Sequence, residues 1–475
     1  MLLFKESQYI MCIEIFKGDF VMYDHLMKYR VTPRVVPAES MATIKIEGTD
    51  ESTRLFDDVE YKIEIIAKEE WEYNKEGEHS LFNRNNTAVL NLYPENGVIT
   101  LNYEFKGEQE WRVVVKPVEC DAHIPQMRKE LWPWLIDGVY CGFDFRIYSL
   151  KEDLYCKKPF KGDLHMHSYD SDGWDSSAFM AAQYRKFGYD FICLTDHYRY
   201  DPSVKLIEYI KNINTAFKVF PGEEVHPKKE GGVYHLVNFG GKASVNDRYY
   251  SNPEKAEAEV KEIEKTLDIL DDRKRHEVAF FKWICDAIRE TGGIAIYPHP
   301  FWVIIDSYNV NNSTTDELFK RRIFDVFEIM GGTDKKHNRM QVEYYNSMQR
   351  NGYKFPIVAS SDAHSAREHN NSHFDQCFTV AFAENTEKIF ESVKNGLSVA
   401  VDNFEVSDQN VYGDFRLVKY TWFLLENYFE NHDELCQAIG LAMRRYAAGD
   451  KNQNTLICML ENELKKYVSE FFGIG

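Results

Sequence analysis

Two histidines one residue apart stand in the segment Lys161-Gly162-Asp163-Leu164-His165-Met166-His167-Ser168-Tyr169-Asp170-Ser171-Asp172-Gly173. On an extended strand, side chains two residues apart project from the same face, so His165 and His167 present two nitrogen ligands side by side. Asp172 follows after a polar turn that ends in Gly173, and such a turn can bring a carboxylate back towards them. Two nitrogen ligands on one strand make half of a metal site. Paired histidines also occur on solvated strand faces, so further ligands elsewhere in the chain are needed to support this prediction.

The size and charge of the chain narrow the classes of function. A length of 475 residues predicts two or three domains. A formal net charge of -19 argues against a general binder of duplex nucleic acid, which needs a broad basic surface. It does not exclude a small phosphorylated substrate or a short oligonucleotide, because bound cations can invert the local field at a buried site.

The cysteines and the N-terminal residues indicate a compartment. The nine cysteines are scattered without a CxxC pair, which fits a reduced cytoplasm. The first residues lack a basic region followed by a long apolar run, and no stretch has the length that spans a bilayer. We therefore expect a cytoplasmic protein without a membrane anchor.

Residues 1–150 have the pattern of a β-rich accessory domain. Apolar and β-branched runs at 42–46, 59–66 and 111–115 alternate with turn residues and predict a sandwich of short strands. Trp132 and Trp134 are assigned to packing between domains, since aromatic side chains bury large areas.

From about residue 155 to 405, helices and strands alternate, which is typical of an α/β domain. A helix is predicted at 177–186, a buried strand at 189–194, and an exposed charged helical insertion at 252–275. After 405 the pattern turns helical, with candidates at 418–428, 434–448 and 455–472. Residues 406–475 are therefore predicted to form a helical C-terminal extension.

Potential metal ligands recur at the ends of the predicted strands, where α/β proteins gather their chemistry. They are His165, His167, Asp172, His197, Glu224, His235, His299, Asp362 and His364. A mixture of imidazoles and carboxylates suits Zn, Mn or Fe better than Ca or Mg. Nine ligands are too many for one ion.

The same motifs resemble those of the PHP (polymerase and histidinol phosphatase) superfamily. The matching blocks, in the family's order over about residues 160–405, are Asp163-Leu164-His165-Met166-His167-Ser168, Ser171-Asp172-Gly173, Thr195-Asp196-His197, Pro221-Gly222-Glu223-Glu224, His235, Pro298-His299-Pro300 and Ser361-Asp362-Ala363-His364. The amidohydrolase type of barrel also begins with His-x-His, but it does not predict the later blocks together.

The resemblance implies a distorted (β/α)7 barrel with three divalent metal ions. The first ion would be held by His165, His167, Glu224 and Asp362. The second would share Glu224 and add His235 and His299. The third would be held by Asp172, His197 and His364. Of the two adjacent acids, Glu224 rather than Glu223 matches the family's Gly-x-Glu spacing.

A metal centre of this kind predicts hydrolysis. Metal ions lower the pKa of a bound water towards ~7 and clamp the attacking and leaving oxygens, so no protein nucleophile is needed. Asp362, His299 and Glu224 are the expected catalytic residues. Residues expected to bind substrate are Arg199, Lys228, Arg367, His226 and His369. For each of these five, an ordinary surface role is an equal alternative.

The first functional hypothesis is a phosphoesterase that acts on a small phosphorylated metabolite, a nucleotide or a short oligonucleotide. The chain also resembles a subset of the superfamily in which a β-rich domain precedes the PHP domain. The segments Pro221-Gly222-Glu223-Glu224-Val225 and 378–400 are similar to those of carbaryl hydrolase-like proteins, and the N-terminal domain favours a carbamate, ester or amide hydrolase of the same metal type. A non-catalytic module stabilised by metal is a third reading. The metal's identity, the oligomeric state and the role of the helical tail are left open by the sequence.

Overall fold

The computed structural model describes residues 28–69, 72–73, 84–119, 142–227, 234–367, 373–405 and 409–473. The chain divides into two compact units. One contains Met1–Tyr155, Phe423–Glu430 and Ser469–Gly475, and the other contains Cys156–Trp422 and Asn431–Val468. We call them the β unit and the α/β unit. The predicted helical extension contributes residues to both, and the predicted domain boundaries stay a prediction.

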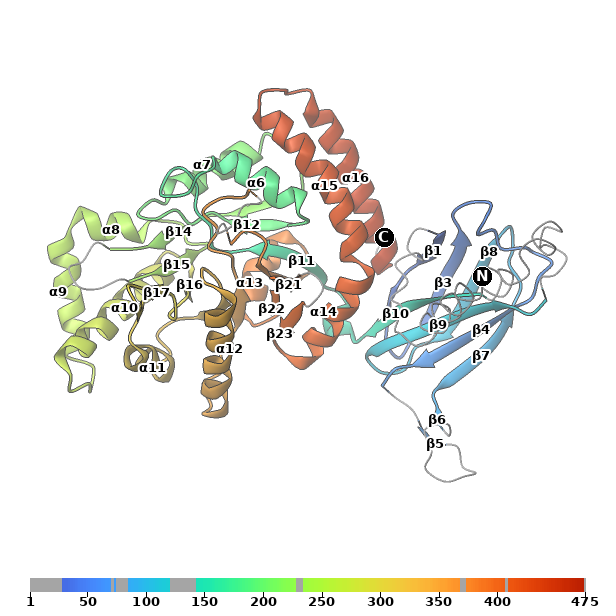
Figure 1. Cartoon of the computed structure of the whole chain (residues 1–475), viewed down its shortest axis with the longest axis horizontal. Coiled ribbons are helices and arrows are strands. Elements are labelled where there is room, and N and C mark those ends of the chain that lie inside the picture. The colour runs from blue at the N-terminus through green and yellow to red at the C-terminus, as the bar shows by residue number, and fades with distance from the viewer. Residues whose placement is uncertain are drawn as a thin grey trace, which may run out of the picture. The chain divides into compact units, whose positions relative to one another are not determined.

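The β unit contains two main sheets (Figure 1). One sheet has the order β1-β3-β8, with β1 (Tyr29–Thr32), β3 (Met41–Gly48) and β8 (Val98–Glu104). The other has the order β2-β10-β9-β4-β7, with β2 (Val35–Pro37), β10 (Phe143–Leu150), β9 (Gln109–Pro117), β4 (Tyr61–Ala67) and β7 (Thr87–Leu92). The short strands β5 (Glu72–Tyr73) and β6 (Arg84–Asn85) pair separately, and helix α5 (Glu152–Tyr155) follows β10.

Alternation of buried and exposed residues explains these strands. Along β3 and β4 every second residue is buried, as expected for a strand with one face on a core. Ile44 and Ile46 of β3 belong to the same hydrophobic cluster as Ile63 of β4 and Val113 of β9, so both sheets contribute to one core. The strands predicted at 42–46, 59–66 and 111–115 are confirmed, whereas Trp132 and Trp134 lie outside the described residues.

The α/β unit contains two larger sheets (Figure 1). The six-stranded sheet has the order β13-β12-β11-β21-β22-β23, with β13 (Lys218–Phe220), β12 (Phe191–Cys193), β11 (Lys158–Asp163), β21 (Cys377–Ala383), β22 (Ser398–Asp402) and β23 (Asn410–Tyr412). The five-stranded sheet has the order β14-β15-β16-β19-β20, with β14 (Gly222–Val225), β15 (Leu236–Phe239), β16 (Ile294–Tyr297), β19 (Val326–Met330) and β20 (Ile357–Ala359).

Two isolated bridges join these sheets, and three of their four residues lie beyond the end of a strand. Met166 pairs with Ala363, and His197 pairs with Glu224, both in parallel fashion. The His167 backbone N–H donates to the Ala363 carbonyl at 2.9 Å, and the Glu224 N–H donates to the Thr195 carbonyl at 3.0 Å. The fold of this unit is therefore mixed α/β, and its two larger sheets are assigned separately rather than as one closed barrel.

Helices cover the sheets of this unit. They are α6 (Ser177–Lys186), α7 (Asp201–Ile210), α8 (Val245–Ser251), α9 (Pro253–Glu264), α10 (Asp272–Glu290), α11 (Asn312–Lys320), α12 (Lys335–Arg350), the 3-10 turn η2 (Thr386–Lys388) and α13 (Ile389–Lys394). The helix predicted at 177–186 is confirmed, and the Ser176 hydroxyl caps its start. The insertion predicted to be exposed instead buries Ala256 and Val260 of α9 in the main core, because one face of that helix is apolar.

The C-terminal segment is helical, as predicted. It forms α14 (Phe415–Asn427), α15 (Phe429–Ala447) and α16 (Gln453–Phe472), of which α15 and α16 are joined by a short turn (Figure 1). Among the described helices, none has a stretch long and apolar enough to cross a membrane.

Buried charges tie α15 and α16 to α6 within the α/β unit. The Arg185 guanidinium lies 2.9 Å from Asp190 Oδ1 and 3.1 Å from Glu461 Oε1, and His432 Nε2 lies 3.1 Å from the same Asp190 oxygen. Burial opposes ionisation of Asp190, but His432 and Arg185 lower the pKa of this carboxyl. Cys436 lies beside His432. Asp190, His432 and Cys436 together form a group of side chains of the kinds that bind metal ions. Because the Arg185 cation already neutralises Asp190, we read this group as an ion-pair network.

Candidate metal centre

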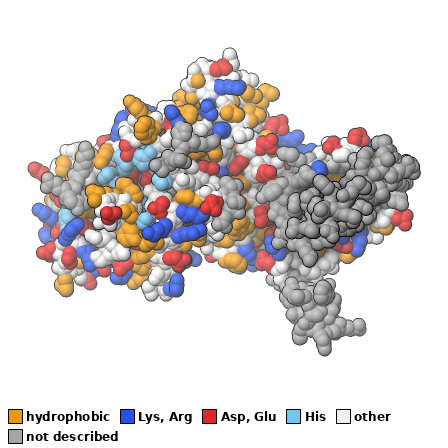
Figure 2. All heavy atoms as spheres, in the orientation of Figure 1, with side chains coloured by type: hydrophobic (Ala, Val, Ile, Leu, Met, Phe, Trp, Pro, Cys, Tyr) orange, Lys and Arg blue, Asp and Glu red, His pale blue; other side chains and the backbone are white. Residues whose placement is uncertain are grey.

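The nine predicted ligands come together in the α/β unit. Eight of them lie on loops that follow β11, β12, β16 and β20 or on β14 itself, and the ninth, His235, directly precedes β15. Histidine side chains gather on one face of this unit (Figure 2). One ligand departs from the expected pattern. His235 was expected at the end of a strand, but it directly precedes one, since β15 begins at Leu236. Since β15 runs antiparallel to β14 and β16, its start lies at the edge where their ligands lie.

The first group contains His165, His167, Glu224 and Asp362, and their ligand atoms all lie within 4.8 Å of one another. His165 Nε2 lies 3.2 Å from Glu224 Oε2 and 3.3 Å from Asp362 Oδ1. His167 Nε2 lies 3.3 Å and 2.9 Å from the same two oxygens. Two imidazoles and two carboxylates thus converge on one buried point.

The second group contains Glu224, His235 and His299. The other oxygen of Glu224, Oε1, lies 2.5 Å from His235 Nδ1 and 3.6 Å from His299 Nε2. The two carboxylate oxygens of Glu224 therefore face different histidines. Glu224 therefore contacts the histidines of both groups at once.

The third group contains Asp172, His197 and His364, together with His167. Asp172 Oδ2 lies 3.3 Å from His364 Nε2 and 3.7 Å from His197 Nε2. The side chains of Asp172 and His364 are 54% and 34% exposed, whereas those of the first two groups are largely buried. The third group is therefore the one that is open to solvent.

If these residues hold metal ions, their ligand atoms should be buried and should have no hydrogen-bond partner in the protein. Several atoms meet this condition. They are His165 Nε2, both ring nitrogens of His167, His235 Nε2, His299 Nδ1, Glu224 Oε2 and Asp362 Oδ1. Several lie near a potential partner but are not directed at it; the 2.9 Å pair of His167 and Asp362 is an example. Unsatisfied buried polar atoms are costly, and convergence on a shared point is what metal ligands require. The residues fit divalent ions.

The electrostatics agree with this fit. Burial opposes ionisation of Glu224 and Asp362, but the surrounding histidines hold the pKa of each carboxyl well below its usual range. Burial also lowers the pKa of His197 to about 3, which leaves a neutral imidazole. Although burial disfavours its charged form, Asp362 and Glu224 raise the pKa of His167 to about 10. The paired carboxylates thus attract a cation at this point, and a metal ion is one.

Backbone strain is concentrated at the same place. His299, Asp362 and Tyr198 have φ angles of 22°, 50° and 62°, which non-glycine residues rarely adopt. Gly332, at φ 55°, lies so close to Asp362 that a Cβ atom on it would be 2.4 Å from Oδ2. The glycine therefore leaves room for this carboxylate.

Glu328 supports the site but was not singled out from the sequence. Its Oε2 lies 3.1 Å from His165 Nδ1, the ring nitrogen that faces away from the first group. Both side chains are fully buried, and burial raises the pKa of Glu328. Its signal in the sequence was an acidic residue inside an apolar strand, β19, all of whose residues are buried. A carboxylate on a ligand's second nitrogen fixes the orientation of the ring.

The structure distinguishes the two adjacent acids of β14. Glu224 faces the histidines, whereas Glu223 accepts hydrogen bonds from Ser244 Oγ at 2.8 Å and from Asn246 Nδ2 at 2.9 Å. Side chains alternate along a strand, so only one of two neighbours can face the site. The placement agrees with the choice of Glu224 made from the Gly-x-Glu spacing.

The five residues predicted to bind substrate differ in whether they lie near the ligand groups. Arg199 pairs with Asp170 at 3.1 Å and with Asp201 at 3.0 Å, and the Arg367 guanidinium lies 2.8 Å from Asp175. His226 is the one of the five that contacts a predicted ligand within the described chain, with its Nδ1 3.3 Å from His197 Nδ1. Lys228 and His369 lie outside the described residues.

Residues 202–214 and 302–315 lie mostly in regular structure. Most of residues 202–214 lie in α7, because Pro202 starts the helix and Leu206 and Ile210 share a buried face. Residues 302–315 contain the hairpin of β17 (Val303–Ile304) and β18 (Ser307–Tyr308) and the start of α11. The Trp302 ring, at the base of this hairpin, lies 5.9 Å from the His235 ring and 5.7 Å from the His299 ring.

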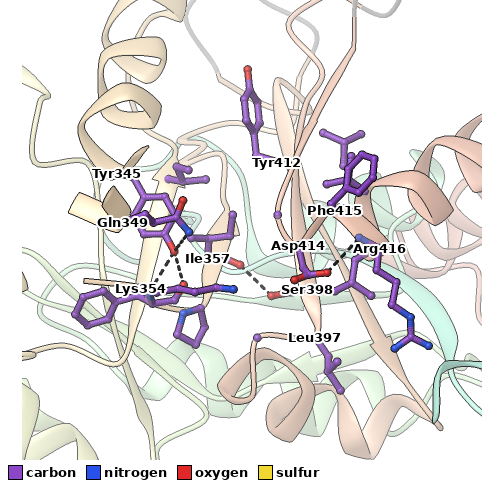
Figure 3. A pocket seen from close by; sticks show the side chains of 18 of the residues that line it. Tyr345, Gln349, Lys354, Ile357, Leu397, Ser398, Tyr412, Asp414, Phe415 and Arg416 are labelled. Carbon is purple, nitrogen blue, oxygen red and sulfur yellow. Dashed lines mark hydrogen bonds between the residues drawn. The ribbon is translucent and has the colours of Figure 1, made fainter. Parts of the chain in front are cut away.

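A separate cavity of about 840 Å³ lies between α12, β22, β23 and the start of α14 (Figure 3). None of the nine predicted ligands lines it. Two of its polar side chains are paired: Tyr345 donates to the Phe355 carbonyl at 2.5 Å, and Asp414 Oδ1 accepts from the Arg416 N–H at 3.1 Å. The predicted metal ligands therefore lie elsewhere in the unit.

Comparisons with known proteins add the following. No protein-family model and no curated protein matches the chain. Among solved structures, one match is a two-domain protein from Bacteroides vulgatus that contains a predicted PHP-like metal-dependent phosphoesterase, with 16% identity and a TM-score of 0.36 over 52% of this chain and 66% of that one.

Two further matches cover less of this chain. A proposed metal-dependent phosphoesterase from Bifidobacterium adolescentis is 15% identical, with a TM-score of 0.31 over 44% of this chain and 90% of that one. An amidohydrolase from Chromobacterium violaceum is 15% identical, with a TM-score of 0.30 over 43% and 87%. The chain spans just under two thirds of the Bacteroides protein. At these similarities the functional proposal depends on the residues of the site.

Proposed function

We propose that this chain is a metal-dependent hydrolase of the PHP type, and that it acts as a phosphoesterase on a small phosphorylated metabolite, a nucleotide or a short oligonucleotide. The single observation that carries the proposal is the meeting of the nine predicted ligands in three groups, the first two of which share Glu224. These groups have the membership that the motif resemblance implies for three metal positions, with His167 also near the third.

We also propose that the α/β unit is a distorted (β/α)7 barrel. Support comes from the two bridges between the sheets. The pairing of Met166 with Ala363 links the end of β20 to that of β11, and the pairing of His197 with Glu224 links the end of β12 to β14. With these links, seven strands follow one another in a ring: β11, β12, β14, β15, β16, β19 and β20.

Each ligand group would hold one divalent metal ion. The first group would hold one ion, Glu224 would share its second oxygen with His235 and His299 at another, and Asp172, His197 and His364 would hold a third. Divalent ions bound there supply Lewis acidity and an activated water near neutral pH. Glu328 keeps the His165 ring in place, and the Trp302 ring shields His235 and His299 on one side. The exposed third group admits the substrate.

A carbamate, ester or amide hydrolase of the same metal type is the second candidate. The observation that favours it is the pairing of Arg199 and Arg367 with carboxylates, since both were expected to hold a phosphate. Attack of water on a carbonyl carbon does not require arginine side chains that bind a phosphate. Metal ions promote this reaction in the same way, by polarising the carbonyl and activating the water.

One experiment compares these candidates. Release of p-nitrophenolate by the Mn-supplemented protein would be measured from a phosphomonoester, a phosphodiester and an aryl carbamate, with Asp362→Ala as the blank and Asp414→Ala, outside the site, as the matched control. Release from a phosphate ester supports the phosphoesterase, and release from the carbamate alone supports the second candidate. If Asp362→Ala releases product as fast as the unaltered chain, the site assignment is refuted.

A further inference from the structure

His226 is an additional histidine at the centre, outside the nine ligands that the motif resemblance implies. It follows β14 directly, two residues after Glu224. One ligand atom each of His226, His197 and His235 lies within 4.8 Å of the others. In the sets described above, His197 belongs to the third position and His235 to the second, so His226 lies where these two positions meet.

The His226 ring is held in place from several directions. Its backbone N–H donates to Asn246 Oδ1 at 3.0 Å, and its carbonyl accepts from the Tyr250 hydroxyl at 3.1 Å. The Tyr198 ring stacks on the imidazole with centroids 5.0 Å apart and planes 22° apart. Tyr198 itself has the strained φ of 62°. A ring fixed in this way presents its nitrogen without further loss of conformational freedom, as a metal ligand must.

The nitrogen of this ring points into the cluster. His226 Nδ1 lies 3.3 Å from His197 Nδ1, and the His226 and His235 ring centroids are 4.1 Å apart. Glu224 closes the remaining side, with Oε2 3.1 Å from His197 Nδ1 and Oε1 2.5 Å from His235 Nδ1. Three imidazoles and a carboxylate therefore surround one small volume.

A hydrogen bond between His226 and His197 explains only part of this arrangement. It would use one proton between two Nδ1 atoms, and His197 Nδ1 also faces Glu224 Oε2. That oxygen is buried and makes no hydrogen bond within the described chain, and the same is true of His235 Nε2. Both belong to side chains that are more than nine-tenths buried. Because Glu224 Oε2 already belongs to the first group, His235 Nε2 is the buried atom left for this cation, which would accept its lone pair.

We infer that His226 is a further metal ligand of this centre, and that it binds beside His197 and His235 where the second and third predicted positions meet. The inference rests on the proposed function, since it adds a ligand to the same centre. Imidazole-rich sites suit Zn²⁺, Fe²⁺ or Co²⁺ rather than Mg²⁺ or Ca²⁺. This chain therefore binds a borderline divalent ion more tightly than the nine ligands alone would.

The test is direct binding of Co²⁺, whose visible absorption reports the number of nitrogen ligands. The full-length protein, stripped of metal, would be titrated with Co²⁺, and bound cobalt would be counted by mass spectrometry after dialysis. His226→Ala and His226→Asn are the test variants. The control His337→Ala removes a histidine that pairs with Asp334 on α12, away from the centre. Circular dichroism of each apo variant confirms folding, and the Asn variant serves if the Ala variant is unfolded.

The expected result is a loss of at least about tenfold in Co²⁺ affinity for one site and a changed absorption spectrum in both His226 variants, with neither change in His337→Ala. An unchanged affinity and spectrum in a folded His226 variant overturns the inference. An Asp362→Ala arm separates this from the proposed function. If Asp362→Ala loses cobalt while the His226 variants keep it, only this inference fails; if the unaltered chain binds no cobalt, the proposed function fails as well.

Discussion

Replacement of Glu328 tests whether a carboxylate behind His165 controls the first metal position. Glu328→Gln keeps the size of the side chain and removes its charge, and Glu328→Ala removes the contact altogether. The contact joins Glu328 Oε2 to His165 Nδ1 over 3.1 Å, with both side chains 0% exposed. Because solvent does not screen the pair, its loss is not offset by water.

The size of the effect follows from this burial. A buried hydrogen bond to a charged group is worth about 1.5–3 kcal/mol, which corresponds to about 10–100-fold in an equilibrium constant. Loss of a carboxylate behind a metal-ligating histidine costs a similar factor in metal affinity. We therefore expect Glu328→Ala to weaken binding at the first position by about 10–100-fold, and Glu328→Gln by less, since an amide oxygen can still accept from Nδ1.

The assay is competition for Zn²⁺ between the protein and a chromophoric chelator, with thermal unfolding of the apo forms measured in parallel. Glu343→Gln on α12 is the matched control, because its side chain lies outside the three ligand groups. Unchanged Zn²⁺ affinity in a folded Glu328→Ala variant would refute the reasoning. A fall in apo stability without a change in affinity would assign Glu328 to the core alone.

Four further outcomes are expected. His299→Ala abolishes turnover of whichever ester the chain hydrolyses while the circular dichroism spectrum is retained, and residual turnover above the Asp362→Ala blank contradicts its role. Gly332→Ala places a Cβ 2.4 Å from Asp362 Oδ2 at a φ of 55°, so it should lower apo stability by about 1–2 kcal/mol in urea unfolding and weaken metal binding; equal stability and affinity would argue against the packing described. Asp190→Asn breaks a buried ion pair and should destabilise the chain by about 3–5 kcal/mol at pH 7. The folded pKa of Asp190 is lowered from 3.8, so the advantage of the unaltered chain is fully present above pH 3.8 and is lost as the pH falls through the lower folded value; a difference independent of pH would refute the linkage. Removal of metal by a chelator should stop turnover, and added Mn²⁺ or Zn²⁺ should restore it, with metal content measured at each step to show that stripping succeeded.

Several features of the site could be read from the sequence because they depend on local order. His165 and His167 share a face since side chains on a strand repeat every two residues. Asp362 and His299 follow apolar runs, and the ends of neighbouring parallel strands meet at one edge of a sheet. The helix at 177–186 starts after a capping serine, Ser176, and has a glycine two residues beyond its end. Each of these signals spans only a few residues.

Other features required strand pairing over long distances. Glu328 lies 163 residues from His165 in sequence, and no local pattern relates them. His235 reaches the site because β15 runs antiparallel to its neighbours, so the start of this strand lies at their ends. Arg199 was expected to face a substrate, but its position beside Asp170 and Asp201 follows from the turn that leads into α7.

The sequence alone therefore determined the kinds of ligand, their order and the alternation of helix and strand, because residue chemistry and backbone periodicity are local properties. Only the tertiary structure decided which ligands share a point, that Glu224 divides its two oxygens between histidines, and that His226 lies against His197 and His235. The physical reason is that these contacts depend on which strands pair and in which direction. The pairing and direction of the strands depend on how the whole hydrophobic core is buried. No single sequence motif encodes that burial.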